Sequence, residues 1–365
     1  MVTLLLKQLP RGCIVLASLF AALAIGLPPA AARTPRTIVA FPGIAHELGY
    51  DSGRVAWIDS AWILRIRSVS NGRQHAIRYT NSYQEVPNPD LSGRPRLAAA
   101  GGRLAWLSTR GAGSHYLADH VYTAIVDNKY GRRVISVQHA EGGAGSYVSG
   151  IAGDSLGFSY GLVKVQASNP DQTNFHVVSG GVWSTVGAQT RRLPGAPPAI
   201  VLARAAGRVA IAPVDTGERS SGVPVARGIV EIRDVATGSL ISTLRPGPMR
   251  AVALTQNVAA ILKGSHIAQY DIKSGRSLKV TLVPSDTSSE LASSGRLLAF
   301  RTAHTVKLLD IISGRVSTVA VATPWRPSRV AIAGHTLVWA ESRRTAPGEV
   351  SGKTFTTRLE LLAVP

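Results

Sequence analysis

The chain has 365 residues, of which 45% are hydrophobic and 17% are charged, and it contains one cysteine. This hydrophobic content is enough for a large core, and a single cysteine excludes an internal disulfide framework. The net charge of +19 favours anionic partners such as wall polymers, lipid head groups or nucleic acid. Because the basic residues are scattered and form no long run, the sequence argues against a nucleic-acid-binding surface.

Residues 1–32 have the features of a cleaved export signal. Lys7 and Arg11 supply the positive start, residues 13–27 form an apolar run, and residues 30–32 form an A-x-A cleavage site. The apolar run is shorter than the roughly 20 residues that a membrane-spanning helix needs. The pattern therefore predicts removal of this segment during export.

The export signal has consequences for the rest of the chain. Cys13 lies at the very start of the apolar run, whereas a lipid-attachment cysteine would follow it. Cleavage after Ala32 leaves residues 33–365 as one domain without cysteine. Lys7 and Arg11 carry two of the positive charges and the leader has no acid, so the mature charge is +17. We expect an extracellular, periplasmic or envelope-associated monomer with no transmembrane segment.

A short phrase recurs along the mature chain: a small or polar turn, then an apolar–small–aromatic strand. The clearest copies are Gly53–Trp57 and Gly102–Trp106. The seven copies are anchored at Val55, Leu104, Leu156, Val209, Val258, Leu298 and Leu337. Their spacing of 39 to 53 residues is typical of the blades of a β-propeller.

A second phrase, D-x-x-[ST]-G-[RS], follows several of these anchors. It begins at Asp234, Asp271 and Asp310. An aspartate side chain caps such a turn, and the glycine supplies the positive φ that the turn needs. We therefore interpret these aspartates as turn formers and not as catalytic groups.

Each repeat accommodates four short strands. The second repeat places them at 96–100, 103–109, 122–128 and 132–138. A helical period with caps at both ends is nearly absent from the chain. Four-stranded units repeated around an axis form a propeller. The prediction is an all-β, seven-bladed β-propeller of four-stranded antiparallel blades over residues 33–365.

The seventh repeat is one strand short. It supplies strands near 328–333, 336–341 and 356–364, after which the chain ends. Thr37–Phe41 is a β-rich segment outside every repeat. We predict that this N-terminal strand closes the last blade, since an unpaired sheet edge invites aggregation.

The phrase Gly-Gly-Arg-Leu-Ala-Trp at residues 101–106 resembles the blades of secreted bacterial propellers of the TolB-like and WD-repeat groups. The S-P-D-G signature of TolB-like blades and the Trp-Asp dipeptide of WD repeats are absent, so the resemblance is to the architecture. Quinoprotein blades share the D-x-x-T-G turn, but the tryptophan expected after it is missing at Asp234–Gly238. No cofactor is therefore expected.

The loops between the second and third strands of the predicted blades are unequal in length. They are long in the second, third, fourth and seventh blades, at 110–121, about 163–173, 213–227 and 342–355. Propellers expose these loops on one face with the blade-to-blade connections, and long loops in compact domains are often functional. The alternative is that they are neutral insertions. The candidate binding residues are Arg110, His115, His120, Asp171, Asp215, Glu218, Arg219, Arg343, Arg344, Glu349 and Lys353.

The sequence contains no recognisable catalytic set. His115, Asp119 and His120 are placed in one predicted loop, but their spacing is not that of a defined metal motif, so no metal site is predicted. We expect a non-enzymatic module that binds a protein or an anionic envelope polymer. The alternative is a glycan- or lactone-cleaving propeller with acidic or histidine side chains at its central mouth.

Overall fold

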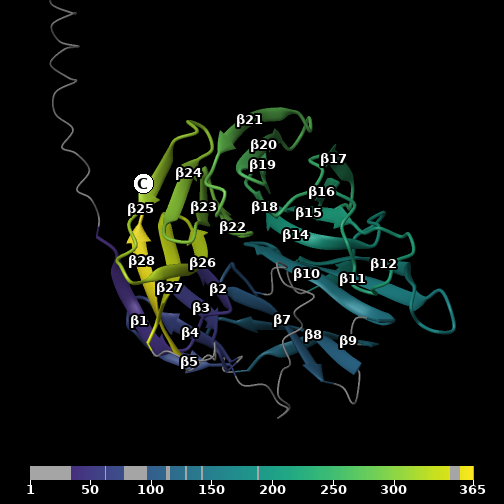
Figure 1. The fold of residues 1–365 in the computed structure, drawn as a ribbon, viewed down its shortest axis with the longest axis horizontal. Coiled ribbons are helices and arrows are strands. Elements are labelled where there is room, and N and C mark those ends of the chain that lie inside the picture. The colour runs from purple at the N-terminus through teal and green to yellow at the C-terminus, as the bar shows by residue number, and fades with distance from the viewer. Residues whose placement is uncertain are drawn as a thin grey trace, which may run out of the picture. The chain divides into compact units, whose positions relative to one another are not determined.

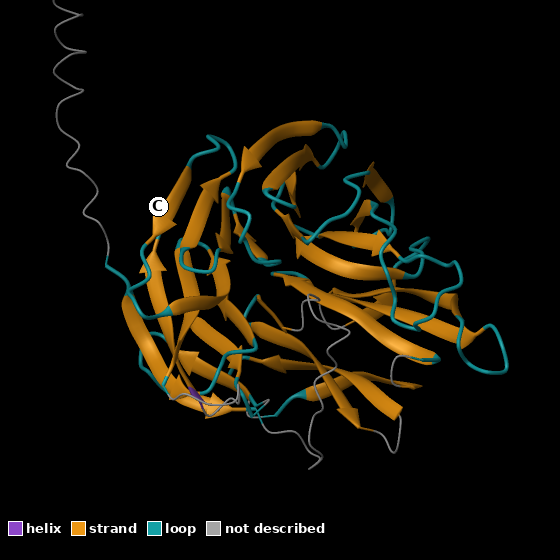
Figure 2. Ribbon diagram, in the orientation of Figure 1, coloured by secondary structure: helices purple, strands orange, loops and turns teal. Residues whose placement is uncertain are grey.

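β-Strands account for nearly all of the regular structure of the protein (Figure 1, Figure 2). The computed structural model describes residues 34–61, 63–77, 97–111, 116–127, 130–140, 143–186, 189–345 and 354–364. These residues contain no α-helix, and therefore no helix that could span a membrane. The predicted export signal at 1–32 lies outside them, and Arg36–Pro365 form a compact unit of their own.

Five of the sheets have four antiparallel strands each. One consists of β2 (Glu47–Asp51), β3 (Arg54–Ile58), β4 (Leu64–Ser68) and β5 (Gln74–Ala76). The next consists of β14 (Ala199–Ala205), β15 (Arg208–Pro213), β16 (Val230–Asp234) and β17 (Leu240–Leu244). A third consists of β18 (Ala251–Leu254), β19 (Val258–Lys263), β20 (His266–Asp271) and β21 (Ser277–Leu282). A fourth consists of β22 (Leu291–Ser294), β23 (Leu297–Arg301), β24 (Val306–Asp310) and β25 (Val316–Val319). The fifth consists of β26 (Arg326–Ala333), β27 (Thr336–Arg344), β28 (Phe355–Ala363) and β1 (Arg36–Pro42).

The remaining sheet has eight strands in two runs of four. The first run consists of β6 (Leu97–Ala100), β7 (Arg103–Gly111), β8 (Tyr116–Ile125) and β9 (Arg132–Ala140). The second run consists of β10 (Gly145–Asp154), β11 (Gly157–Ala167), β12 (Phe175–Val186) and β13 (Gln189–Arg192). The two runs are joined through the pair His139–Gly145 of β9 and β10. Each run therefore corresponds to one of the repeats predicted from the sequence.

The first strands of successive units contact one another. β2 contacts β6, and the contacts continue through β10, β14, β18, β22 and β26. β26 then contacts β2, so the series returns to its starting sheet. These first strands, which we call the inner strands, lie toward the middle of the arrangement (Figure 1).

The hydrophobic core lies between the faces of successive units. Ile66 and Trp106 belong to one cluster that joins the sheet of β2–β5 to β6–β9. Trp57 and Val338 belong to another, which joins the last sheet to the first. Because side chains alternate between the two faces of a strand, strands buried on both faces are apolar at successive positions. The low charge content of the chain follows from this arrangement.

The recurring strand phrase forms the second strand of its unit in six of its seven copies. Its aromatic positions are among the largest fully buried side chains: Trp57, Trp106, Phe300 and Trp339. The anchor predicted at Leu156 is wrong, because this residue is 53% exposed in the turn before β11, and Phe158 is buried instead. A Cβ at Gly157 would lie 2.1 Å from the carbonyl oxygen of Thr185, so glycine begins this strand and the phrase is shifted by two residues.

The turn-forming role of the recurring aspartates is confirmed. The backbone N–H of Thr237 donates to Asp234 Oδ1 at 2.8 Å, and that of Ser274 donates to Asp271 Oδ1 at 2.7 Å. Asp310 accepts equivalent bonds. The glycine of each turn has a φ between 69° and 79°, which only glycine adopts without strain.

The N-terminal strand pairs with the last sheet. β1 is antiparallel to β28 over Arg36–Pro42. Thr37 Oγ1 donates to Glu360 Oε1 at 2.6 Å, and the ring of Phe41 stacks on Trp57 with the centroids 5.4 Å apart. This strand therefore contacts both the last sheet and the first.

Candidate binding face

The inner strands begin at one face of the unit, which we call the loop face. Arg329 of β26 donates from Nε to the carbonyl oxygen of His46, which directly precedes β2. Arg250, directly before β18, donates from Nε to Ser289 Oγ, shortly before β22, at 3.3 Å. Within each sheet the second strand ends, and the third begins, beside the start of the first. The loops between second and third strands therefore belong to this face.

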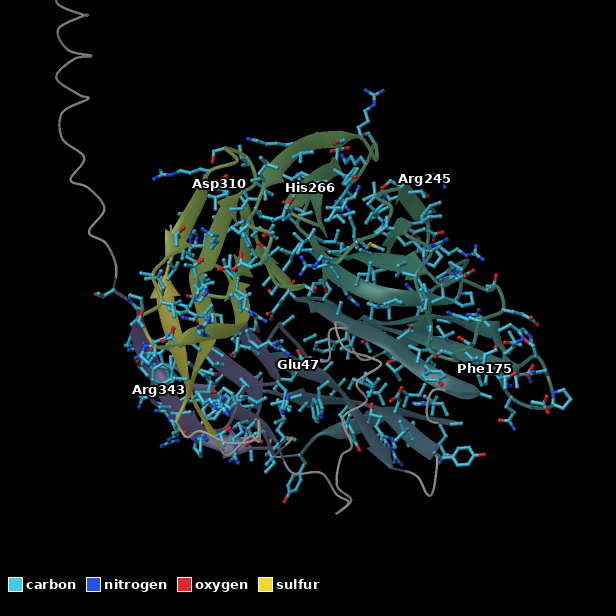
Figure 3. All side chains as sticks on the ribbon, viewed as in Figure 1. Glu47, Phe175, Arg245, His266, Asp310 and Arg343 are labelled. Carbon is cyan, nitrogen blue, oxygen red and sulfur yellow. The ribbon has the colours of Figure 1, made fainter. Side chains whose placement is uncertain are left out.

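A channel of about 460 Å³ lies between the inner strands. At the loop face, its charged lining residues come from four consecutive sheets: Arg250, Glu290, Arg301, Arg329 and Glu47. Figure 3 labels Glu47 close to the middle of the arrangement. Three guanidinium groups face two carboxylates, so the mouth of the channel is basic.

Glu290 binds groups from two neighbouring sheets. Its Oε2 lies 3.3 Å from Nε of Arg301, and its Oε1 accepts the backbone N–H of Val330 at 3.3 Å. Burial raises the pKa of the Glu290 carboxyl, and the charges of Arg329 and Arg301 oppose this rise. The carboxyl group is thus the counter-charge of an arginine cluster between β23 and β26.

The same crowding acts on the arginines. Burial and the nearby Arg329 lower the pKa of Arg301, and Glu290 opposes this change. Arg301 Nη1 donates to the carbonyl oxygen of Pro327 at 3.2 Å, and Arg329 Nη1 donates to that of Ser328 at 3.1 Å. Main-chain acceptors therefore fix both guanidinium groups in place.

A second cavity, of about 690 Å³, lies beside the channel and shares Arg301 and Arg329 with it. Its basic lining is Arg301, Arg326, Arg329, Arg343 and Arg344. No Asp or Glu occurs among the described residues that line it. We call it the arginine cavity.

Two exposed arginines of this cavity are oriented by ring contacts. Arg326 donates from Nη1 to Nδ1 of His304, at 3.2 Å. The guanidinium carbon of Arg343 lies 4.9 Å from the ring centroid of Trp325, and that of Arg358 lies 4.4 Å from it. Such contacts stabilise a guanidinium group by about 0.5–2 kcal/mol and hold its plane in one orientation.

On the other side of the loop face, the predicted long loops brace one another. Phe175, at the start of β12, and Arg219 of the 214–229 connection exchange two backbone hydrogen bonds of 2.8 and 3.0 Å. A Cβ at Gly222 would lie 2.0 Å from the carbonyl oxygen of Gly143, so this connection packs directly on the turn between β9 and β10. The connections of three consecutive units therefore form one continuous surface.

The candidate residues on this surface have different environments. Asp171, Asp215 and Glu218 are exposed. Arg219 is half-buried and donates to the carbonyl oxygens of Asp215 at 3.0 Å and Val223 at 3.2 Å. Burial lowers its pKa, and Asp215 opposes this change. Arg219 therefore shapes the connection, whereas the acidic side chains are accessible.

Asp119 and His120 do not lie in a loop, so that part of the interpretation is wrong. Both belong to β8, where Asp119 is fully buried and accepts from Thr109 Oγ1 at 2.7 Å and from the backbone N–H of Val148 at 2.9 Å. His120 is 9% exposed and meets the ring of Tyr122 edge-on. The apolar residues on either side of them continue β8 into the segment that was predicted as a loop. Asp119 and His120 are therefore strand residues with buried side chains.

The other candidate residues divide into two groups. Arg343 and Arg344 are exposed at the end of β27 and line the arginine cavity. Arg110 belongs to β7, but its side chain lies outside the described part. His115, Glu349 and Lys353 also lie outside it. Among the residues that the structure describes, no three or more His, Cys, Asp or Glu side chains gather as metal ligands.

Sequence reasoning missed the residues at the starts of the inner strands. Arg250, Glu290, Arg326 and Arg329 all lie at or beside the connection from one sheet to the next. Such connections share a face with the loops between second and third strands. Their charged residues are therefore candidates for the same binding face. Arg301, at the end of β23, escaped because its loop is short.

Two solved structures resemble the chain over most of its length. One, described as the mitotic checkpoint complex, has a chain that is 14% identical with a TM-score of 0.53, over 93% of this chain and 98% of that chain. The other is the β-propeller domain of Cps50 (Swd1) from Myceliophteria thermophila, 13% identical with a TM-score of 0.52, over 91% of this chain and 100% of that chain. No family model and no curated protein matches the sequence. The likeness shows a propeller-like fold.

Proposed function

We propose that this protein is an exported, non-enzymatic β-propeller that binds a protein partner through the loop face. In this proposal the propeller has seven blades and is closed by β1. The cyclic series of inner-strand contacts, the pairing of β1 with β28 and the hydrophobic cluster between the last and first sheets support it. The proposal of export is based on residues 1–32, whose charge and apolar pattern is that of a leader.

The braced surface of three consecutive units carries the proposal of protein binding. Phe175 and Arg219 tie two of its connections together, and Gly222 packs on a third. A surface that is ordered before binding loses little conformational entropy when a partner docks. Asp171 and Glu218 extend from it into solvent and are suited to polar contacts at the rim of an interface.

Single-cysteine labelling tests this surface. The chain from Arg33 onward has no cysteine, so Asp171→Cys or Glu218→Cys creates one attachment point for a polyethylene glycol maleimide. Ser277→Cys is the matched control, because Ser277 is exposed but begins β21 beyond a turn on the opposite face. Labelled and unlabelled proteins are used to capture partners from an envelope extract. We expect labelling at the first two positions to abolish capture and labelling at Ser277 to preserve it.

Equal capture by all labelled proteins would show that partners do not bind at this surface, and no capture by the unlabelled chain would reject a protein-binding role.

The alternative enzymatic function rests on carboxyl groups at the channel mouth. Glu47 and Glu290 both line it, but Glu290 is paired with Arg301. Hydrolysis of a glycan or lactone that disappears with Glu290→Gln would favour the enzyme.

A further inference from the structure

The arginine cavity has a lining that a protein-binding surface on the opposite side of the loop face does not explain. Its volume of about 690 Å³ falls within the range of roughly 300–1,000 Å³ that is usual for small-molecule sites. Like charges gathered in a concave site repel each other, so a bound anion would relieve the repulsion among these arginines. We infer that this cavity binds a sugar acid or sugar phosphate, whose carboxylate or phosphate contacts Arg326 and Arg343.

Arg326 and Arg343 are suited to bind an oxyanion. They come from β26 and from the end of β27, and both line the cavity. A guanidinium group has five N–H donors, of which Arg326 uses one on His304. The guanidinium carbon of Arg343 lies over the ring of Trp325, and this contact uses none of the N–H groups as donors to an oxygen, which an oxyanion would accept from. Both side chains are therefore held in orientations that are compatible with a bound carboxylate or phosphate.

The deeper arginines contribute positive potential. Arg301 and Arg329 are fixed by main-chain carbonyl oxygens at the boundary with the channel. Glu290 supplies a counter-charge to them from the channel side, and its carboxyl is not part of the cavity lining. The cavity side of the cluster therefore stays electropositive, while Arg326 and Arg343 make the direct contacts.

The apolar part of the lining indicates that the ligand has a carbon body. Ile44, Pro324 and Phe355 line the cavity together with the arginines. A bare inorganic ion would leave this apolar wall in contact with water. A sugar ring that bears an acidic group would cover the wall and place its oxyanion among the guanidinium groups. The same chemistry occurs in a free small molecule and in the repeat unit of an acidic polymer.

Calorimetric titration at low ionic strength tests the site on the chain from Arg33 onward, which contains the whole compact unit. The probes are galacturonate, glucose 6-phosphate, polygalacturonate and inorganic phosphate. The variant is Arg326→Gln with Arg343→Gln. The control is Arg132→Gln with Arg133→Gln, which removes the same charge from two exposed residues of β9. Arg326→Lys keeps the charge but removes the planar donor edge.

We expect at least one sugar probe to bind more tightly than inorganic phosphate. The Arg326/Arg343 variant should bind that probe at least about tenfold more weakly, and the control pair should stay within about twofold of the original protein. Arg326→Lys should be weakened less than the double variant. Binding of galacturonate identifies a free ligand, whereas binding of polygalacturonate alone identifies a polymer repeat, and either result supports the site.

The inference is overturned if no sugar probe binds more tightly than about 10 mM, or if both arginine pairs weaken binding equally. Equal weakening would mean that general positive charge attracts the probes. Because Arg326 and Arg343 are exposed, the melting temperature of the double variant should stay close to that of the control. The cavity does not depend on Asp171 or Glu218, so failure of one proposal leaves the other intact.

Discussion

Substitution of Phe41 tests whether the packing of β1 contributes to the stability of the fold. The side chain is half-buried and its ring stacks on the buried Trp57 of the first sheet. A fully buried phenylalanine costs about 3–5 kcal/mol when cut back to alanine, so a half-buried one that also loses a ring contact costs about 2 kcal/mol. For about 330 residues the unfolding entropy is about 0.7 kcal/mol/K, so Phe41→Ala should lower the melting temperature by about 3 °C.

Differential scanning calorimetry at one scan rate measures this shift. Leu282→Ala is the matched control, because Leu282 also lies on a strand but is 81% exposed, and it should shift the melting temperature by less than about 1 °C. Removal of residues 33–43 should lower the melting temperature further, since the whole pairing with β28 is lost. If both changes leave the melting temperature at the control value, β1 does not close the last sheet.

Three further predictions concern buried or crowded groups. Arg204→Met should lower the free energy of unfolding by about 3 kcal/mol in urea titration, because it leaves the carboxylate of Asp154, now 2.9 Å from Arg204 Nε, without its counter-charge; a loss below about 1 kcal/mol would contradict the importance of this pair. Gly161→Ala should destabilise the fold by about 2 kcal/mol or more, since its Cβ would lie 2.4 Å from a main-chain carbonyl oxygen of β14; unchanged stability would show that the sheets separate easily. The pKa of Glu290 is raised in the folded state, so the original protein loses stability as the pH rises from about 4.5 and this carboxyl ionises. Glu290→Gln has no group to ionise there, so its free energy of unfolding should rise relative to that of the original protein over the same pH range. Parallel pH profiles of the two proteins in urea titration would contradict the raised pKa of Glu290.

The strand and turn pattern was predictable because it depends on neighbours in the sequence. Side chains two positions apart in a strand lie on the same face, as Leu104 and Trp106 do. A glycine four positions after an aspartate, such as Gly238 after Asp234, provides the positive φ of the turn. The prediction failed at Leu156, where contact with another strand decides the register. The next residue, Gly157, must be glycine because a Cβ would clash with the carbonyl oxygen of Thr185. Thr185 lies almost thirty positions further along the chain, so a local sequence pattern cannot report this contact.

The candidate site was predictable only in part, for a related reason. The exposed acidic side chains of Asp171 and Glu218 follow from loop length, which the sequence displays directly. The arginine cavity instead combines Arg301, Arg326 and Arg343, which belong to three separate strands of two sheets. The sequence predicted Arg343 and Arg344 from their long loop, but Arg301, Arg326 and Arg329 join them only when the sheets are assembled.

The placement of charged residues explains why only 17% of the chain is charged although its net charge is +19. The strand faces that pack between sheets are mostly apolar, so charged residues lie mainly at strand ends, in connections and at solvent-facing strand positions such as Lys279. On the loop face, the braced connections expose acidic side chains, whereas the connections beside β26 and β27 expose arginines (Figure 3 labels Phe175 and Arg343 on the two sides). Electrostatic potentials act over roughly 8 Å at physiological ionic strength, which is shorter than the distance across a domain of this size. The two regions therefore attract ligands independently, and the acidic surface does not cancel the attraction of the arginine cavity for an oxyanion.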